Sequence, residues 1–301
     1  MKVPAKLAAF TAVLALLFAG GALAGDLVGP DRGPAAAGSH GGAASDHDSN
    51  SEEHTDMTST STGAQGAAHP VRGLAVAEDG LRLVVEEPEL RRGREEQLAF
   101  RIVDERGETV RDFDVEHTKR MHLILARRDL TGFQHLHPEQ RADGTWTVSV
   151  RLDDAGSYRL FADFSHEGEA RTLATDLRVD GPADLRPLPA PRATAVSDGG
   201  YDVRLDASEA RPSEEAELRF SVTKDGVPVH TEPYLGAGGH LVALRDGDLA
   251  FLHVHPTEDG HGDDDSVGFA ATFPTEGRYR LFLQFRHEGR VQTVAFSQDV
   301  K

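Results

Sequence analysis

Short runs of alternating apolar and polar residues dominate the chain from residue 71 to residue 181. A period of two is typical of a strand that buries one face, and turn sequences such as Asp104-Glu105-Arg106-Gly107 separate the runs. The runs predict strands at residues 81–85, 97–103, 121–126, 146–150, 158–164 and 172–179. Strands at a spacing of roughly ten residues, without helical periodicity, indicate an antiparallel β-sandwich.

The segment Asp154-Ala155-Gly156-Ser157-Tyr158, just before an alternating run, resembles the tyrosine corner of immunoglobulin-like domains. In that motif the tyrosine hydroxyl donates a hydrogen bond back to the backbone a few residues upstream. The motif therefore predicts a sandwich of the immunoglobulin-like type.

The same strand pattern occurs a second time in residues 192–301. Residues 216–222 correspond to the run that contains Phe100, and segments 158–168 and 279–289 are identical at eight of eleven positions. A proline-rich stretch at residues 182–191 separates the copies and predicts a short, semi-rigid linker. The sequence thus predicts an all-β protein with two tandem immunoglobulin-like modules, at residues 71–181 and 192–301.

The first 70 residues have a different character. Residues 1–24 combine a basic start with an apolar run from Leu7 to Ala24, which predicts either a secretory signal peptide or an uncleaved membrane anchor. Residues 25–70 are rich in Gly, Ala, Ser, Asp and His and poor in large apolar residues, so we expect a disordered tether. Both interpretations export the rest of the chain, which would be extracytoplasmic, either secreted or tethered to the cell membrane.

Composition narrows the chemistry. The chain has 50 acidic and 32 basic residues and a formal net charge of -18, which disfavours nucleic acid as a partner and favours cations. It contains no cysteine, which excludes disulfides, thiolate metal sites and thiol nucleophiles. With only three methionines, the chain is also poorly equipped for Cu(I).

Four histidines recur in the same order in both copies. They are His122, His135, His137 and His166 in the first copy, and His240, His253, His255 and His287 in the second. Several flanking positions have diverged between the copies, for example Gln134 and Leu252, whereas all four histidines are retained. An apolar residue or a threonine would suit a strand equally well, so the retained histidines are the candidate functional residues.

The histidines of the first copy are expected to converge. Residues 121–138 predict a β-hairpin whose turn is centred between Asp129 and Leu130, and this count places His122 opposite His137. His135 points to the same face as His137, because residues two apart on a strand share a face. Cross-strand neighbours lie about 5 Å apart at Cβ, close enough to share an ion.

In the second copy the turn at Asp246-Gly247 places His240 opposite His253 or His255. The fourth histidine of each copy, His166 or His287, ends a later strand. We expect it to close the ligand shell from the rim of the sandwich or to orient the other ligands.

Imidazole ligands favour Zn(II) and Cu(II), with Ni(II) behind them. We therefore expect a Cu(II) or Zn(II) site in each copy, and we expect its affinity to fall below about pH 6.5 because ligand imidazoles must be neutral. The alternative is that the histidines make structural hydrogen bonds in an envelope interaction module without a metal. The sequence also leaves open whether the copies hold two separate sites or share one ion.

Other histidines and catalytic patterns are weaker. His117 and His230 precede the two hairpins at unequal distances, and His261 lies in an acidic loop at residues 258–265 that the first copy lacks. A His-x-His on a Greek-key strand resembles the copper half of Cu/Zn superoxide dismutase, but that enzyme's cysteine pair and bridging histidine are absent. A nucleophile elbow is absent as well. We do not expect an enzyme, and copper redox activity is the remaining alternative.

One further resemblance rests on His122, residues 129–138, Gly144-Thr145-Trp146 and residues 155–164. This set is similar to a group of exported, often membrane-anchored proteins of high-GC Gram-positive bacteria, mostly described as hypothetical secreted or heavy-metal-binding proteins. The second copy resembles the same group through residues 233–240 and 248–256, so the match covers roughly residues 71–301. More distantly, the modules look like the small sandwich domains of the YtkA and CopC type in copper handling, although the methionine cluster of CopC is absent. The resemblance implies metal handling or resistance, with a metal ion as partner and a membrane or envelope protein as a further one.

Overall fold

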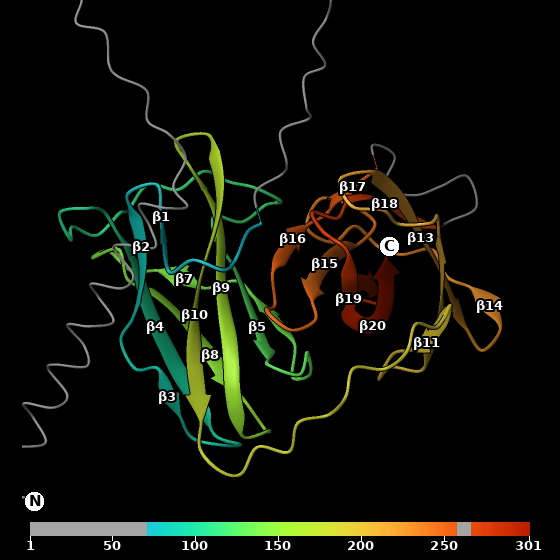
Figure 1. The fold of residues 1–301 in the computed structure, drawn as a ribbon, viewed down its shortest axis with the longest axis horizontal. Coiled ribbons are helices and arrows are strands. Elements are labelled where there is room, and N and C mark those ends of the chain that lie inside the picture. The colour runs from blue at the N-terminus through green and yellow to red at the C-terminus, as the bar shows by residue number, and fades with distance from the viewer. Residues whose placement is uncertain (1–70, 258–265) are drawn as a thin grey trace, which may run out of the picture. The chain divides into compact units, whose positions relative to one another are not determined.

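The computed structural model describes residues 71–257 and 266–301 (Figure 1). The secondary structure of these residues consists of β-strands, and no helical segment among them could span a membrane. The signal peptide or anchor expected at residues 1–24, the tether expected at 25–70 and the acidic loop at 258–265 lie outside the described residues.

The first repeat forms two sheets of five strands each. Its strands are β1 (Ala77–Glu78), β2 (Leu81–Val85), β3 (Glu89–Leu90), β4 (Glu95–Val103), β5 (His122–Arg127), β6 (Gln134–Leu136), β7 (Glu139–Gln140), β8 (Trp146–Arg151), β9 (Gly156–His166) and β10 (Glu169–Val179). One sheet has the order β1-β2-β4-β8-β7 and the other β3-β10-β9-β5-β6. All neighbours are antiparallel except the short pair of β3 and β10, which is parallel.

The second repeat has the same plan. Its strands are β11 (Thr194–Val196), β12 (Tyr201–Ala207), β13 (Glu215–Lys224), β14 (Val227–Pro228), β15 (His240–Arg245), β16 (Phe251–His253), β17 (His255–Pro256), β18 (Val267–Thr272), β19 (Gly277–His287) and β20 (Arg290–Val300). The sheets have the orders β11-β12-β13-β18-β17, with β14 beside β13, and β16-β15-β19-β20. The chain is therefore a tandem all-β sandwich, as predicted.

The six strands predicted for the first repeat correspond to β2, β4, β5, β8, β9 and β10. The predicted tyrosine corner is also present, because the hydroxyl of Tyr158 donates a hydrogen bond to the carbonyl of Asp154 at 3.0 Å. The second repeat has the same bond from Tyr279 to the carbonyl of Thr275, also at 3.0 Å. In both repeats the bond fixes the start of the long strand that crosses the middle of the second sheet, β9 or β19.

Each repeat has its own apolar core between its two sheets. In the first repeat Phe100 on β4 and Leu160 on β9 are fully buried in this core, and in the second repeat Phe220 on β13 and Leu281 on β19 are their counterparts. Large apolar side chains at alternate positions of facing strands are the expected filling of a sandwich. These two cores explain why each repeat folds as a sandwich.

A third apolar cluster joins the two repeats. It contains residues from the outer faces of the two histidine-bearing sheets, meaning the faces turned away from each sandwich core: Ile124, Ala126, Leu130, Phe161, Ala174, Val242, Leu244, Leu249, Phe251 and Phe282. The rings of Phe133 and Phe282 are stacked at 4.0 Å between centroids. As a result all six residues of β5 are buried, because both of its faces are covered.

A buried ion pair closes the β5–β6 hairpin and holds the linker. The guanidinium of Arg127 bonds both carboxylate oxygens of Asp129, at 2.9 and 2.6 Å, and donates to the carbonyls of Ala155 and Asp184. The backbone N–H of Arg186 donates to the same carboxylate. These bonds hold the pKa of the Asp129 carboxyl well below its usual range, even though burial opposes the shift. The linker is thereby attached to the first repeat.

Replacing Arg127 with methionine should lower the free energy of unfolding by about 3–5 kcal/mol, because it leaves the Asp129 carboxylate buried without its counter-charge. Urea unfolding followed through the fluorescence of Trp146, which lies in the core of the same repeat, measures this loss. The matched control is Arg151→Met, whose ion pair with Asp153 is 61% and 70% exposed and should contribute less than about 1 kcal/mol. Equal losses in both variants would contradict a structural role for the buried pair.

Candidate metal centre

Three histidines meet on the β5–β6 hairpin. The pairing of the two strands aligns Leu123 with Leu136 and Ile124 with His135, so one further step along the register places His122 opposite His137. This is the register that the sequence predicted. In the turn between the strands, Leu130 and Gly132 both have a φ of 61°. This left-handed conformation favours glycine, which is the residue found at position 132.

The three side chains are close enough to hold one ion. One ring nitrogen from each of His122, His135 and His137 lies within 4.8 Å of the other two. Nδ1 of His122 and Nε2 of His135 are 3.0 Å apart. The side chains of His122 and His135 are only 3% and 8% exposed, so this is a buried cluster.

Two carbonyl oxygens set the tautomers of these rings. Nε2 of His122 lies 3.2 Å from the backbone carbonyl of Glu116, and Nδ1 of His135 lies 2.7 Å from Oε1 of Gln284. A carbonyl oxygen only accepts hydrogen bonds, so both of these nitrogens carry the hydrogen when the rings are neutral. The opposite nitrogens, Nδ1 of His122 and Nε2 of His135, then direct their lone pairs toward each other.

The third ring adds another buried nitrogen. Nε2 of His137 is inaccessible to solvent and has no hydrogen-bond partner within the part of the chain that the structure describes. Buried polar atoms almost always have a partner, so each exception needs a reason. Ring nitrogens of His122 and His135 lie within 4.8 Å of a nitrogen of His137, so a cation bound among the three rings would provide that reason.

Burial keeps the rings of His135 and His137 neutral. It lowers the pKa of His135 to about 3, and the neighbouring His122 and His137 act in the same direction. Burial and the proximity of His122 and Lys119 lower the pKa of His137 to about 4. Neutral imidazole is the form that would bind a metal ion, so His135 and His137 stay in that form well below the pH of about 6.5 expected from an ordinary imidazole.

The second repeat contributes an imidazole to the same cluster. The ring of His240 is stacked on that of His122 at 5.7 Å between centroids, with an angle of 7° between the planes, and lies 4.7 Å from that of His135. The ring of His117 lies 6.2 Å from that of His122 and 5.9 Å from that of His240. The sequence had ranked His117 as a weak candidate, and it gave no indication of Gln284.

His166 does not join this cluster. Its Nδ1 lies 2.8 Å from the backbone carbonyl of Asp112, and its ring packs beside that of Phe113 in the core of the sandwich. Along β9, His166 shares a face with Phe164, whereas His122 pairs with Asp163 on the opposite face. The period of two therefore separates His166 from the other three histidines.

The second-repeat histidines are only partly described. His253 pairs with Val242 at the end of β16, whereas His255 begins β17 and pairs with Ala270 of β18 in the other sheet, and the side chains of both histidines lie outside the described part of the structure. Nδ1 of His287 lies 2.9 Å from the hydroxyl of Tyr201. A second ligand shell around His240 therefore stays a prediction.

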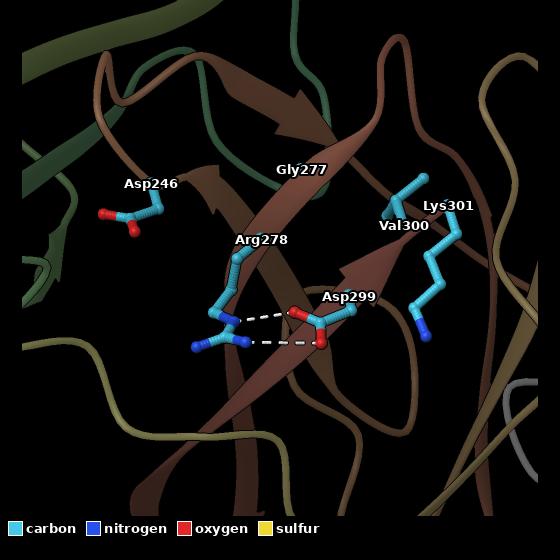
Figure 2. A pocket seen from close by; sticks show the side chains of 6 residues that line it. All are labelled: Asp246, Gly277, Arg278, Asp299, Val300 and Lys301. Atoms are coloured by element: carbon cyan, nitrogen blue, oxygen red, sulfur yellow. Dashed lines mark hydrogen bonds and ion pairs between the residues drawn. The ribbon is translucent and has the colours of Figure 1, made fainter.

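Two surface hollows elsewhere on the described residues differ in their lining: one contains His166 with Asp112, Asp114 and Glu167, and the other contains no histidine. Figure 2 shows the second, of about 320 Å³, lined by Asp246, Gly277, Arg278, Asp299, Val300 and Lys301. Its central feature is an ion pair in which Arg278 Nε lies 2.7 Å from Oδ1 of Asp299 (Figure 2). Both charges are already paired with each other, and no imidazole lines the hollow.

A family model described as "Domain of unknown function (DUF8832)" matches residues 75–181 and 194–301, so the chain belongs to this family and contains its domain twice. A search of curated proteins found no match.

Several solved structures match the chain, with low identities and low TM-scores. A mutant alpha-2-macroglobulin of Salmonella is 15% identical over 77% of this chain and 15% of its own, with a TM-score of 0.27. The Escherichia coli adhesin FdeC is 14% identical over 75% of this chain and 66% of its own, with a TM-score of 0.24. InvD of Yersinia pseudotuberculosis is 9% identical over 74% of this chain and 58% of its own, with a TM-score of 0.24. The chain thus spans less than two thirds of each of these proteins.

The lowered pKa of His135 predicts how the free energy of unfolding of the metal-free protein depends on pH. Between about pH 3 and its ordinary pKa of 6.5, this ring is neutral in the folded state and protonated in the unfolded state. The unfolded state therefore binds more protons, and the free energy of unfolding must fall as the pH falls through this window, by about 2 kcal/mol from this residue at pH 5.

Urea unfolding at pH 7.5 and pH 5.0, with a chelator present, measures this dependence. His135→Gln should be less stable than wild type at pH 7.5 but should lose less stability on going to pH 5. The same pH-dependent loss in both proteins would show that His135 is not held neutral by the fold.

Proposed function

We propose that this chain, a member of a family whose description leaves its activity open, binds Cu(II) or Zn(II) outside the cytoplasm through His122, His135 and His137. One observation carries the proposal: one ring nitrogen from each of three buried or half-buried histidines lies within 4.8 Å of the other two, while two carbonyl oxygens lie at the outer nitrogens of His122 and His135. A set of neutral nitrogen ligands without a carboxylate or a thiolate suits Cu(II) and Zn(II) best.

The spacing of the nitrogens fits such an ion. Two nitrogens bound to a tetrahedral ion at 2.0–2.1 Å lie about 3.3 Å apart. The separation of 3.0 Å between Nδ1 of His122 and Nε2 of His135 is near this value. The nitrogen of His137 lies within 4.8 Å of both, so a small rotation of that side chain completes a three-nitrogen set. Three protein ligands leave one position for water or for a further imidazole.

A purely structural role explains the cluster less well. A histidine that only stabilises a strand is expected to donate from one nitrogen and accept at the other. Here the carbonyl of Glu116 and the amide oxygen of Gln284 take the donors of His122 and His135, and the remaining lone pairs face each other at 3.0 Å. Neutral rings in this arrangement repel unless a cation lies between them. The structural alternative, an envelope interaction module without metal, predicts no such cation.

The cellular role follows from the same chemistry together with the N-terminal sequence. An apolar segment at residues 1–24 is typical of exported or membrane-anchored chains, and the net charge of -18 attracts cations. We therefore place the protein in extracytoplasmic metal handling or resistance. A second ion in the second repeat, with His240, His253 and His255 as ligands, is part of this proposal.

Calorimetric titration of the full chain with Zn(II), and separately with Cu(II), tests the proposal. His137→Ala should weaken binding at the first site by at least about 100-fold, because it removes one of three ligands. His166→Ala is the matched control, since this ring has the carbonyl of Asp112 as partner and lies on the other face of β9. It should bind like the wild type.

The number of metal ions bound per chain distinguishes the variants further. The wild type should bind two equivalents, and the pair His253→Ala/His255→Ala should lose one of them. A wild type that takes up neither metal above the level of a His122→Ala/His135→Ala/His137→Ala variant would reject the metal proposal and favour the interaction module.

A further inference from the structure

Residues of the second repeat form one side of the proposed metal site. Gln284 on β19 places its Oε1 2.7 Å from Nδ1 of His135, although the two residues are 149 positions apart in the sequence. Gln284 is 6% exposed, so water does not compete for this bond. The first repeat does not supply the acceptor that sets the tautomer of its own ligand.

Neighbouring side chains hold the Gln284 amide in place. Its Nε2 donates to Oγ1 of Thr293, the residue directly opposite on β20, at 3.2 Å. In this orientation the amide oxygen is the atom turned toward His135. The first repeat has Asp163 and Thr172 at the corresponding positions, also directly opposite each other, with a hydrogen bond of 2.6 Å between them. The sheet thus builds the same polar pair twice, once with an amide and once with a carboxylate.

The apolar contact between the repeats brings Gln284 to His135. Phe282 lies two residues before Gln284 on the same face of β19, and its ring is stacked on that of Phe133 at 4.0 Å. Phe133 in turn lies two residues before His135. The Phe133–Phe282 and His135–Gln284 contacts are therefore adjacent, and both join β19 to β6 or to the residue just before it.

We propose that Gln284 is a positioning residue that acts across the repeats, so that the ligand set on the first repeat is complete only when the second repeat is docked. The inference rests on the proposed function and adds a coupling to it. Partners of this kind, which bond the outer nitrogen of a ligand histidine, typically change metal affinity 10- to 100-fold. By thermodynamic linkage, the metal then tightens the docking by the same factor.

Competition titration of the full chain with Zn(II) and a chromophoric chelator at pH 7.5 tests the coupling. Gln284→Leu should lower the affinity of the first site by 10- to 100-fold, because Nδ1 of His135 loses its acceptor. Gln284→Glu keeps an acceptor oxygen at the same place and should restore affinity to within a few fold of wild type. Gln298→Leu is the matched control, since that amide lies on β20 and donates to the carbonyl of Asp299.

Two readouts separate positioning from a general effect on the fold. In wild-type protein with Zn(II), nitrogen-15 NMR should show the hydrogen of His135 on Nδ1, and Gln284→Leu should allow the other tautomer. In a His135→Ala background, Gln284→Leu should cause no further loss of affinity, because its effect passes through His135.

The outcomes distinguish this inference from the proposed function. If wild type and Gln284→Leu bind Zn(II) equally while His137→Ala does not bind, the three-histidine site stands and the coupling is wrong. If Gln284→Leu weakens binding equally in the wild-type and His135→Ala backgrounds, positioning through His135 is also wrong. If the wild type does not bind, the proposed function fails, and the inference fails with it.

Discussion

Packing between the outer faces of the β5–β9 and β15–β19 sheets is the interaction on which the candidate site depends. In a single immunoglobulin-like sandwich this face of β5 would meet water and would carry polar residues. Here Ile124, Phe161 and Phe282 form an apolar cluster on it, and the histidines extend that face toward one end. The burial that joins the repeats is therefore also the burial that removes water from His122 and His135.

Burial of this kind puts opposing demands on an imidazole. An apolar environment strongly disfavours the charged form, which explains the low pKa values of His135 and His137. The same environment penalises a polar nitrogen without a partner. The fold meets the second demand at the outer nitrogens of His122 and His135, through Glu116 and Gln284, and leaves Nε2 of His137 without a partner in the described structure. The proposed metal ion would meet both demands at once, because it would bind neutral rings and supply a partner for their lone pairs.

The sequence was sufficient for the parts of the site that depend on local pairing. Alternation located the strands, and the symmetric count around Asp129 and Leu130 gave the register that joins His122 to His137. The contribution of Gln284 could not be predicted, because docking between repeats leaves no spacing rule in the chain. One indication was present in the run Met121 to Ala126, which is apolar at every position except His122. Such a run is typical of a strand buried on both faces, and this reading would have pointed to a covered outer surface.

The net charge of the chain and the chemistry of the candidate site act on different properties of a cation. The net charge acts on its charge, and the site acts on its preference for nitrogen or oxygen. A net charge of -18 raises the local concentration of all cations, including Mg(II) and Ca(II), without choosing among them. The site itself presents nitrogen, whereas these hard ions require oxygen ligands. A buried carboxylate, that of Asp163, lies on β9 directly opposite His122, and it accepts a hydrogen bond from Thr172 at 2.6 Å. In the proposed function, the net charge would attract cations at long range and the nitrogen ligands would select among them at short range, which would favour a borderline ion such as Cu(II) or Zn(II).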